Sequence, residues 1–313
     1  MNKLTRNLIK IIGWVLILVG IVAAYFGPIE IFVFYLFSAG GSLYYEGFRV
    51  GSFWFAVLVV MNIAYYALAA ICLPAGIGHV KLRRWGYTLT HLYLWFWLGA
   101  GIWLALCLIM LIPPAMKLDL SREVLFGRMA LAGVFAFIVL ILLPLLVLRF
   151  YRGEKVRAAF EQHDPNPYWT ERTPFPVLAL LLLFAILIVG LHAAIFFQCI
   201  FPMFGLVLLG RQAVPWIALC ILIVGVLMYG TARLKRWAWW GSAVFLSLLT
   251  LSTVLSFSRL RFYDIILKMD LPAYEMDFLD RMVLLHDYSL AGLFAIPLLA
   301  ALGLVIASKR YFR

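Results

Sequence analysis

The stretch Val177–Phe197, VLALLLLFAILIVGLHAAIFF, contains no Asp, Glu, Lys or Arg and decides the fold class of the chain. A helix needs roughly 20 mostly apolar residues to cross the hydrocarbon core of a bilayer, because each residue adds only about 1.5 Å. Backbone polar groups in lipid must also find partners within the protein, and a helix supplies them. The stretch is therefore predicted to be a transmembrane helix.

The composition of the whole chain agrees with this prediction. Of its 313 residues, 66% are apolar and 13% are charged, against about 45–50% and about 25% in soluble domains. This excludes a cytosolic enzyme, a secreted disulfide scaffold and a disordered tail. We expect an all-α integral membrane protein with eight transmembrane helices. The predicted spans are Leu8–Phe26, Ser52–Pro74, Tyr87–Leu111, Met129–Leu148, Val177–Phe197, Val214–Gly230, Trp237–Phe257 and Ser289–Ala307.

The charges of the connecting segments predict the orientation. One side of this topology carries 17 of the 26 Lys and Arg residues and four of the 14 acidic residues, a net charge of +13. The other side carries nine Lys and Arg residues and ten acidic residues, a net charge of −1. Because basic loops stay in the cytoplasm, we expect a multi-pass protein of a bacterial cytoplasmic membrane with both termini cytoplasmic. The basic excess then has the bilayer as its partner, and no nucleic acid is needed to explain it.

Three segments of the first half of the chain recur in the same order in the second half. The pairs are Ile17–Phe26 with Leu187–Phe196, Lys81–Trp85 with Arg233–Trp237, and Leu131–Ala136 with Leu290–Ala295. Their offsets of 170, 152 and 159 residues place the length differences in loops. Each half contains an even number of spans, so both copies have the same orientation. We expect two tandem parallel four-helix repeats.

The predicted domains follow from this duplication. The first four-helix membrane unit is residues 1–148, a cytoplasmic linker is residues 149–176, and the second four-helix unit is residues 177–313. The mixed charge at the start of the linker favours a short surface helix, and the prolines of Asp164–Pro167 and Pro174–Pro176 favour an extended connector after it. His163 and Asp164 are interpreted as part of a solvated loop.

Small residues recur at helical spacing in both copies. Gly20 and Ala24 in the first copy match Gly190 and Ala194 in the second. Such pairs let helix backbones approach closely in lipid, where no hydrophobic force separates a helix from an acyl chain. We interpret all four residues as helix-packing positions.

Two basic turns with a tryptophan lie at the cytoplasmic ends of spans. Tryptophan beside Lys or Arg at a span end is typical of an interfacial anchor, and such turns could also bind lipid phosphates. The predicted lipid or interface anchors are Lys81, Arg83, Arg84, Trp85, Arg233, Lys235, Arg236 and Trp237.

The sequence contains no motif that names a reaction. No Walker A, GxGxxG, HExxH or GxSxG pattern occurs, so no catalytic residue, metal or cofactor is assigned. His192 and His286 could both lie near the outer face and bind a cofactor, but neither recurs in the other copy.

The cysteines are interpreted as packing residues, although a disulfide between Cys199 and Cys220 is possible. They are Cys72, Cys107, Cys199 and Cys220.

Hydroxyl residues gather in the seventh span, where they could line a polar path, bond between helices or bond to carbonyls of their own helix. We favour the last two. The residues are Ser242, Ser247, Thr250, Ser252, Thr253 and Ser256.

Two outer segments also carry recognisable patterns. Pro28–Gly51 is interpreted as interfacial or re-entrant, because its apolar core Ile29–Phe37 is too short to span. Ser258–Asp287 is acidic, and its apolar spacing predicts two short amphipathic helices on the outer surface.

Three functions are compatible with these patterns. Spans without charges in their interiors, short loops and the absence of an active-site motif favour a non-catalytic structural or scaffold subunit of a larger membrane complex, with other membrane protein subunits as partners. The alternative is an uncoupled carrier or lipid-handling protein with a site between the two repeats. A third hypothesis is an enzyme that uses the carboxylates of residues 258–287 as acid and base. The sequence favours a role without catalysis.

Overall fold

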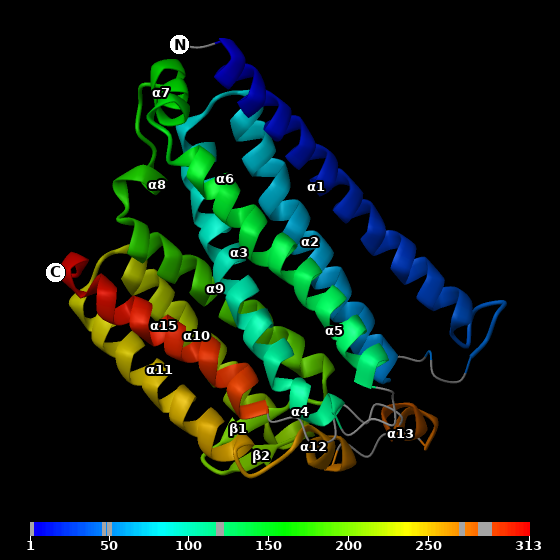
Figure 1. The fold of residues 1–313 in the computed structure, drawn as a ribbon. Helices are drawn as coiled ribbons and strands as arrows, with labels where there is room; N and C mark the ends of the chain where they lie inside the picture. Colours follow the sequence, from blue (N-terminus) through cyan, green and yellow to red (C-terminus); the bar gives the residue numbers. More distant parts are fainter. Residues whose placement is uncertain (1–2, 46–47, 49–51, 117–121, 269–272, 281–289) are drawn as a thin grey trace. The chain divides into compact units, whose positions relative to one another are not determined.

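A computed structural model describes residues 3–45, 48, 52–116, 122–268, 273–280 and 290–313 of the chain. The chain is 83% helical, and eight helices in this described part are long and apolar enough to cross a membrane (Figure 1). The prediction of an all-α, multi-pass membrane protein with eight spans is confirmed at this level.

The described residues fall into two compact units. Unit 1 takes its residues from the ranges 1–50, 54–102 and 134–175, and unit 2 takes them from 51–53, 103–133 and 176–313. The boundaries between the units therefore fall within four of the candidate spans, near the end of two of them and in the interior of the other two. Each unit has its own buried apolar core, and each is described separately below.

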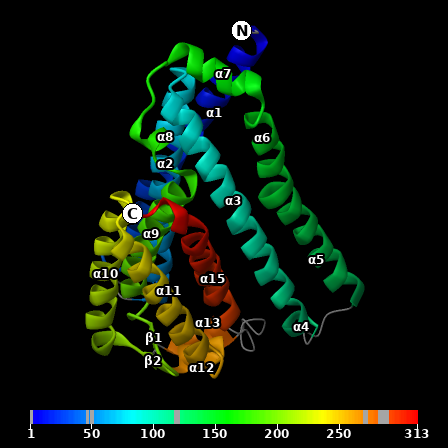
Figure 2. The same cartoon turned by 90° about the vertical axis from the view of Figure 1, so that its left-hand side faces the viewer.

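The helices of unit 1 are mostly spans joined by short turns. They are α1 (Lys3–Phe37), α2 (Phe53–Val80), most of α3 (Arg84–Met110), π-helix η1 (Phe137–Leu142), α6 (Leu143–Tyr151), α7 (Glu154–His163) and α8 (Trp169–Arg172). Helix α5 (Arg122–Ala136), which runs directly into η1, lies mostly in unit 2. Figure 2 shows α7 lying across the ends of α1 and α6. The core at this end contains Ile9 of α1, Tyr151 of α6 and Phe160 of α7, each no more than 1% exposed.

The first outer segment differs from the prediction. Ile29–Phe37 is not a separate re-entrant piece, because α1 continues through Pro28 and ends only at Phe37, a length of 35 residues. A membrane helix tolerates a proline where neighbouring groups satisfy the freed backbone. The longer helix includes Glu30, whose Oε1 accepts a hydrogen bond of 2.8 Å from the hydroxyl of Tyr65 on α2.

Unit 2 contains the remaining spans and most of the short elements. They are α4 (Ile112–Ala115), α9 (Phe175–Phe196), strands β1 (Phe201–Met203) and β2 (Leu206–Leu208), η2 (Gly210–Gln212), α10 (Val214–Ala232), α11 (Arg236–Phe257), α12 (Phe262–Lys268), α13 (Ala273–Asp280), α15 (Leu290–Ser308) and η3 (Lys309–Tyr311). Helix α11 packs along α10 and α15. Phe184 of α9, Val224 of α10, Leu246 of α11 and Val305 of α15 meet in a core that excludes solvent completely.

A small antiparallel hairpin closes the loop between α9 and α10, where the sequence analysis predicted no element. Phe201 pairs with Leu208 and Met203 with Leu206. The two turn residues, Phe204 and Gly205, have φ values of +41° and +99°. Two consecutive positive φ values match the right-handed twist of a two-residue hairpin, which explains the glycine.

The second outer segment contains the two short helices expected there. Ile265 and Ile266 of α12 are buried against Phe257 of α11 and Leu290 of α15. The apolar residues Met269, Met282 and Leu285 on which that prediction also rested lie outside the described residues. The helices therefore exist, and one of them packs into the core of unit 2 rather than standing free of it.

Candidate functional site at the two basic turns

The basic turns that the sequence analysis singled out have the same backbone geometry. In the turn after α2, Leu82 has φ = +47°, and in the turn after α10, Leu234 has φ = +54°. The N–H of Arg83 donates to the Gly78 carbonyl at 2.7 Å, and the N–H of Lys235 donates to the Gly230 carbonyl at 3.0 Å. These bonds span five residues and define a Schellman motif at each helix end.

Each motif places a leucine where glycine is usual. A left-handed conformation costs an L-residue with a Cβ roughly 1–2 kcal/mol. Leu82 offsets this cost by burial, because it is only 2% exposed in the core of unit 1. Leu234 is half-buried against the core of unit 2. The side chain after each helix thus anchors its turn to the core beneath it.

A glycine at the end of each preceding helix allows the next helix to approach. A Cβ on Gly78 would lie 2.7 Å from Cα of Gly86, and a Cβ on Gly230 would lie 2.6 Å from Cβ of Ala238. Both distances are too short for carbon atoms, so neither glycine can be replaced without movement. The two turns share this restriction at positions 152 residues apart.

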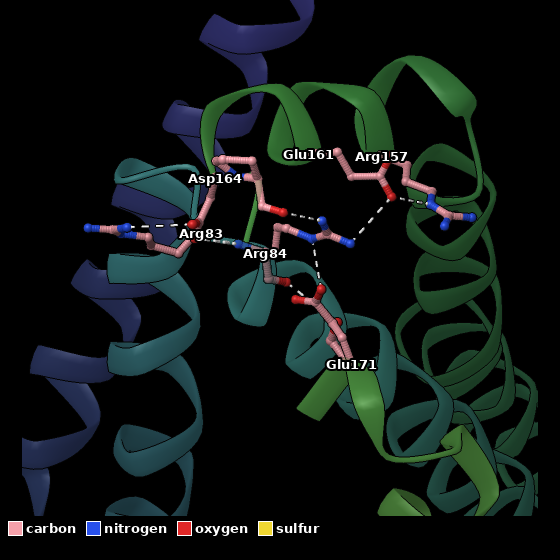
Figure 3. Close-up of polar contacts among 8 residues, drawn as sticks. Arg83, Arg84, Arg157, Glu161, Asp164 and Glu171 are labelled. Carbon is pink, nitrogen blue, oxygen red and sulfur yellow. Dashed lines mark hydrogen bonds and ion pairs between the residues drawn. The ribbon is translucent and has the colours of Figure 1, made fainter. Parts of the chain in front are cut away.

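Three carboxylates of the linker surround the turn of unit 1, as Figure 3 shows. Nε of Arg84 lies 2.7 Å from Oε2 of Glu171, and its Nη2 lies 3.7 Å from Oε1 of Glu161. Nη1 of Arg83 lies 3.7 Å from Oδ1 of Asp164. Glu161 also accepts a bond of 2.8 Å from Nε of Arg157 on the same face of α7. Three cations and three anions balance within this cluster.

Asp164 contradicts the prediction of a solvated loop. Its side chain is 6% exposed, and its Oδ2 accepts a 3.4 Å bond from the N–H of Arg84, the first residue of α3. A carboxylate at a helix N-terminus satisfies a backbone donor that the helix itself leaves open. His163 beside it is exposed, as predicted. The linker is held against the turn by Asp164 and not merely connected to it.

The electrostatics of Glu171 reflect its burial. Desolvation raises the pKa of its carboxyl above the ordinary value, and the Arg84 guanidinium opposes the rise without cancelling it. Ionised Glu171 is therefore costly in the folded protein despite its cation. This cost makes Arg84 important for keeping the linker in place.

A buried histidine lies beneath the cluster and was missed by the sequence analysis. The span Ser52–Pro74 was expected to end at its proline, whereas α2 continues to Val80 and contains His79, which is fully buried. Nδ1 of His79 is 2.6 Å from the carbonyl of Ala75, which can only accept, so Nδ1 carries the proton. Nε2 then accepts from the hydroxyl of Tyr151 at 2.6 Å.

The turn of unit 2 is surrounded by different groups. The N–H of Arg236 donates to the backbone oxygen of Arg313 at 3.0 Å, and the N–H of Arg313 donates to the Leu234 carbonyl at 2.9 Å. Nζ of Lys309 lies 5.3 Å from the ring centre of Trp239. No Asp or Glu side chain among the described residues lies within ion-pair distance of these cations. The turn of unit 1 is thus surrounded by acidic side chains, and the equivalent turn of unit 2 is not.

The remaining anchor residues lie at the surface of these turns. Lys81, Arg233, Lys235 and Trp237 are exposed, and Trp85 is half-buried. The guanidinium of Arg233 stacks over the ring of Tyr229 at 5.6 Å from its centre. Their position at helix ends fits the anchor interpretation, which remains a prediction because the structure contains no membrane.

The residues proposed for packing and for a cofactor have unequal surroundings. A Cβ on Gly20 would meet the side chain of Leu73 on α2 at 2.7 Å, whereas a Cβ on Gly190 would meet nothing within 4 Å. Ala24 and Ala194 are both half-buried. Nδ1 of His192 is 2.8 Å from the carbonyl of Ile188 in its own helix. His286 lies outside the described residues, so the proposed pair cannot be placed.

The hydroxyl groups of α11 are used as the sequence analysis favoured. Ser242, Thr250 and Thr253 each donate to the carbonyl four residues earlier, at 2.6–2.7 Å. Ser252 donates to the Pro202 carbonyl and accepts from the N–H of Phe204, both at 2.9 Å. Ser256 accepts from Gly205 at 3.1 Å. The helix thereby holds the hairpin in place.

All four cysteines are buried and free, which confirms the packing interpretation.

The described part of the acidic outer segment contains one buried carboxylate. Glu275 of α13 is 1% exposed, and its Oε1 accepts a 3.0 Å bond from the N–H of Phe53, the first residue of α2. Its neighbour Asp280 accepts a hydrogen bond from Tyr263 of α12, which raises the pKa of the Tyr263 hydroxyl. Glu275 caps a helix that begins 222 residues earlier, a role that spacing along the sequence does not reveal.

Comparisons with known proteins add no assignment. No protein-family model matches the chain, and no curated protein or solved structure is significantly similar to it. Within the described residues, no group of three or more His, Cys, Asp and Glu side chains could hold a metal ion.

Proposed function

We propose that the protein is a non-catalytic structural or scaffold subunit of a larger membrane complex. The observation that carries the proposal is the internal pairing of the charged cluster in unit 1. Arg83, Arg84 and Arg157 each pair with a linker carboxylate of the same chain. Ion-pair networks of this kind perturb pKa values for structural reasons, without a substrate. The cluster fastens the linker to the membrane helices.

The packing of the spans also supports the proposal. Within Phe126–Tyr151 only 11% of the most apolar window is buried by the chain, compared with 39% within Arg236–Phe257. Membrane helices associate through close packing and hydrogen bonds with their neighbours. Exposed apolar side chains of this span, such as those of Leu131 and Phe135, are available to lipid or to a helix of another protein.

We further propose that the chain consists of two tandem parallel four-helix repeats. The support is the shared turn, in which Leu82 and Leu234 adopt the same uncommon conformation. Non-glycine residues rarely adopt positive φ. Two leucines that do so at matching positions are better explained by common descent than by chance similarity between apolar helices.

The proposed location is a bacterial cytoplasmic membrane with both termini in the cytoplasm. In unit 1 the start of α1, the Arg84 turn and the linker lie at one end. In unit 2 the Arg236 turn and the last residues of the chain lie at one end. Each unit thus gathers its basic segments at one end, as a cytoplasmic face requires. The short helices α12 and α13 would lie at the outer interface.

Purification from the native membrane tests the proposed function. The tagged chain is extracted in a mild detergent, and the co-purifying proteins are quantified by mass spectrometry. We expect one or more membrane proteins at a fixed ratio to the chain. The double variant Leu131→Ala with Phe135→Ala should lower that ratio, because both residues are exposed on α5. The matched control is Leu222→Ala with Val244→Ala on exposed faces of unit 2.

The opposite outcome is equally clear. A chain that purifies alone, stays monodisperse and remains stable at dilution would contradict the subunit proposal. It would favour an uncoupled carrier or lipid-handling protein with its site between the two repeats. Equal ratios in the α5 variant and its control would show that α5 is not the surface that contacts the partner.

A further inference from the structure

We propose that a pocket at the Arg236 turn binds the phosphate of an anionic phospholipid. The pocket has a volume of about 680 Å³ and lies within unit 2, between the first residues of α11 and the last residues of the chain. It is lined by Arg236, Trp239, Trp240, Ile306, Ala307, Lys309, Arg310 and Phe312. This inference goes beyond the proposed function and does not depend on it.

The charge of the pocket indicates an anionic ligand. Arg236, Lys309 and Arg310 all line it, and none of them pairs with an Asp or Glu side chain in the described part of the chain. Among the described residues, their one polar side-chain partner is the hydroxyl of Tyr311, to which Arg310 donates at 2.6 Å. Three cations around one cavity repel each other unless an anion lies between them. The phosphate of a phospholipid headgroup supplies that charge and several hydrogen-bond acceptors.

The duplicated turn provides an internal comparison. Arg236 occupies the position that Arg84 occupies in unit 1, 152 residues earlier. There the linker carboxylates neutralise the arginine, with Glu171 only 2.7 Å from it. In the described part of the chain no Asp or Glu side chain pairs with Arg236, and the other charged residues that line its pocket are Lys309 and Arg310. The position that the chain neutralises in one unit is left for an external anion in the other.

The aromatic wall of the pocket is held in place through Trp239. Nε1 of Trp239 donates to the Val305 carbonyl at 2.8 Å, which fixes the indole against α15. The rings of Trp239 and Trp240 meet edge to face with centres 4.6 Å apart. Lys309 lies over the face of Trp239 and is held there by the cation–π interaction. A preformed wall reduces the entropy lost on binding.

The apolar wall favours a lipid over free phosphate. Ile306 and Ala307 line the pocket, are exposed, and belong to the candidate span Leu290–Tyr311. A ligand that contacts both the cations and this wall needs an anionic head and an acyl chain. Basic residues beside tryptophans at a span end are the groups that recognise anionic headgroups at the cytoplasmic interface.

Lipid retention by the full-length protein tests the proposal. The purified chain, together with any partner that accompanies it, is delipidated in a neutral detergent. It is then mixed with micelles that contain either phosphatidylglycerol or phosphatidylcholine, and bound lipid is counted by native mass spectrometry. We expect selective retention of phosphatidylglycerol. Inorganic phosphate alone, followed by phosphorus NMR, is the arm that detects a free-phosphate site.

The decisive variant is the triple substitution Arg236→Gln, Lys309→Gln and Arg310→Gln. It removes three charges and leaves a polar, uncharged side chain at each position. Because each Lys or Arg near an anionic surface contributes about fivefold to binding, the triple variant should lose about a hundredfold in affinity for phosphatidylglycerol. The charge-preserving triple Arg236→Lys, Lys309→Arg and Arg310→Lys should retain the lipid, which separates loss of charge from loss of folding.

The matched control removes the same number of charges from exposed arginines of unit 2. Arg128→Gln, Arg211→Gln and Arg259→Gln change residues that neither line the pocket nor belong to a basic turn, so retention should stay within about twofold of the wild type. Equal retention of the two lipids would overturn the proposal. An equal loss in both Gln triples, or binding of inorganic phosphate without retention of phosphatidylglycerol, would also overturn it.

Discussion

Arg84 and Glu171 form the most buried ion pair among the described residues, with side chains 21% and 14% exposed and an Nε to Oε2 distance of 2.7 Å. Arg84 begins α3, and Glu171 belongs to the short helix α8 of the linker. The pair therefore joins a spanning helix to a segment nearly 90 residues later. Burial raises the pKa of Glu171 in spite of its partner, so the two members of the pair are not equivalent.

Replacing Arg84 should destabilise the protein more than replacing its exposed neighbour. Arg84→Gln leaves a buried carboxylate without its cation, and we expect a loss of about 1–3 kcal/mol in the free energy of unfolding. Arg157→Gln removes one side of an exposed pair on α7 and should cost about 0.3–0.5 kcal/mol. Thermal unfolding in detergent measures both losses. Similar losses for the two variants would show that the Arg84 pair has no special structural role.

The pH dependence of Glu171→Gln should have a defined sign. The folded-state pKa of Glu171 lies above its ordinary value, so the folded protein binds this proton more tightly than the unfolded chain does. The contribution of Glu171 to stability is complete below its unfolded pKa and is lost as the pH rises through its folded pKa. The wild type should therefore lose stability relative to Glu171→Gln between pH of about 4 and about 7.

The sign is tested by measuring the unfolding midpoints of the wild type and Glu171→Gln at pH of about 4 and about 7. Glu154→Gln, at an exposed position of α7, controls for the change in net charge. A wild type that gains stability over Glu171→Gln as the pH rises would mean that Arg84 outweighs the desolvation of Glu171.

The glycines before the two turns should be equally intolerant of a side chain. Gly78→Ala and Gly230→Ala each place a Cβ within 2.7 Å of an atom of the next helix, and we expect each to cost about 1–3 kcal/mol. Gly99→Ala and Gly225→Ala are the controls, because their added Cβ would meet nothing within 4 Å. These controls should be neutral or stabilising by up to about 1 kcal/mol. If Gly230→Ala kept its stability while Gly78→Ala lost it, the two turns would not share the same steric restriction.

The spans were predictable because hydropathy and backbone satisfaction in lipid act locally. Their ends were less predictable, and Pro74 shows why. The predicted span stops at Pro74, but a membrane helix can continue past a proline, so α2 reaches Val80 and contains the buried His79. In the same way α1 passes through Pro28 and includes Glu30. Both extensions depend on tertiary neighbours that a window of residues does not contain.

The candidate site was predictable only in part. The basic turns were identified from the sequence, because repeated Lys and Arg beside tryptophan form a local pattern. The carboxylates that neutralise one turn were not identified, since Asp164 and Glu171 reach it from about 80 residues away. Glu275, which caps α2 across 222 residues, was missed for the same reason. A contact between two charged residues that are far apart in the sequence produces no local pattern from which it could be predicted.

The hydrogen bond between Tyr151 and His79 should support the end of unit 1. Tyr151→Phe leaves Nε2 of a fully buried imidazole without its donor, and we expect a loss of about 1–3 kcal/mol. Tyr87→Phe removes a longer bond, 3.1 Å to the Tyr151 carbonyl, and should cost about 0.5–1.5 kcal/mol. Unfolding midpoints rank the two variants. The reverse order would show that the imidazole does not rely on the Tyr151 hydroxyl.

Ser252 should hold the hairpin, whereas Ser242 should not affect it. Ser252→Ala removes the acceptor of the Phe204 N–H and the donor to the Pro202 carbonyl, so the hairpin should open more often. Ser242→Ala removes only a bond to its own helix at Ala238, which contributes little to helix stability. Hydrogen exchange followed by mass spectrometry checks the difference. Protection of the hairpin amides should fall by about tenfold in Ser252→Ala, as expected for about 1.4 kcal/mol, and stay unchanged in Ser242→Ala. Unchanged protection in both variants would place the restraint on the hairpin in its own turn, at Phe204 and Gly205.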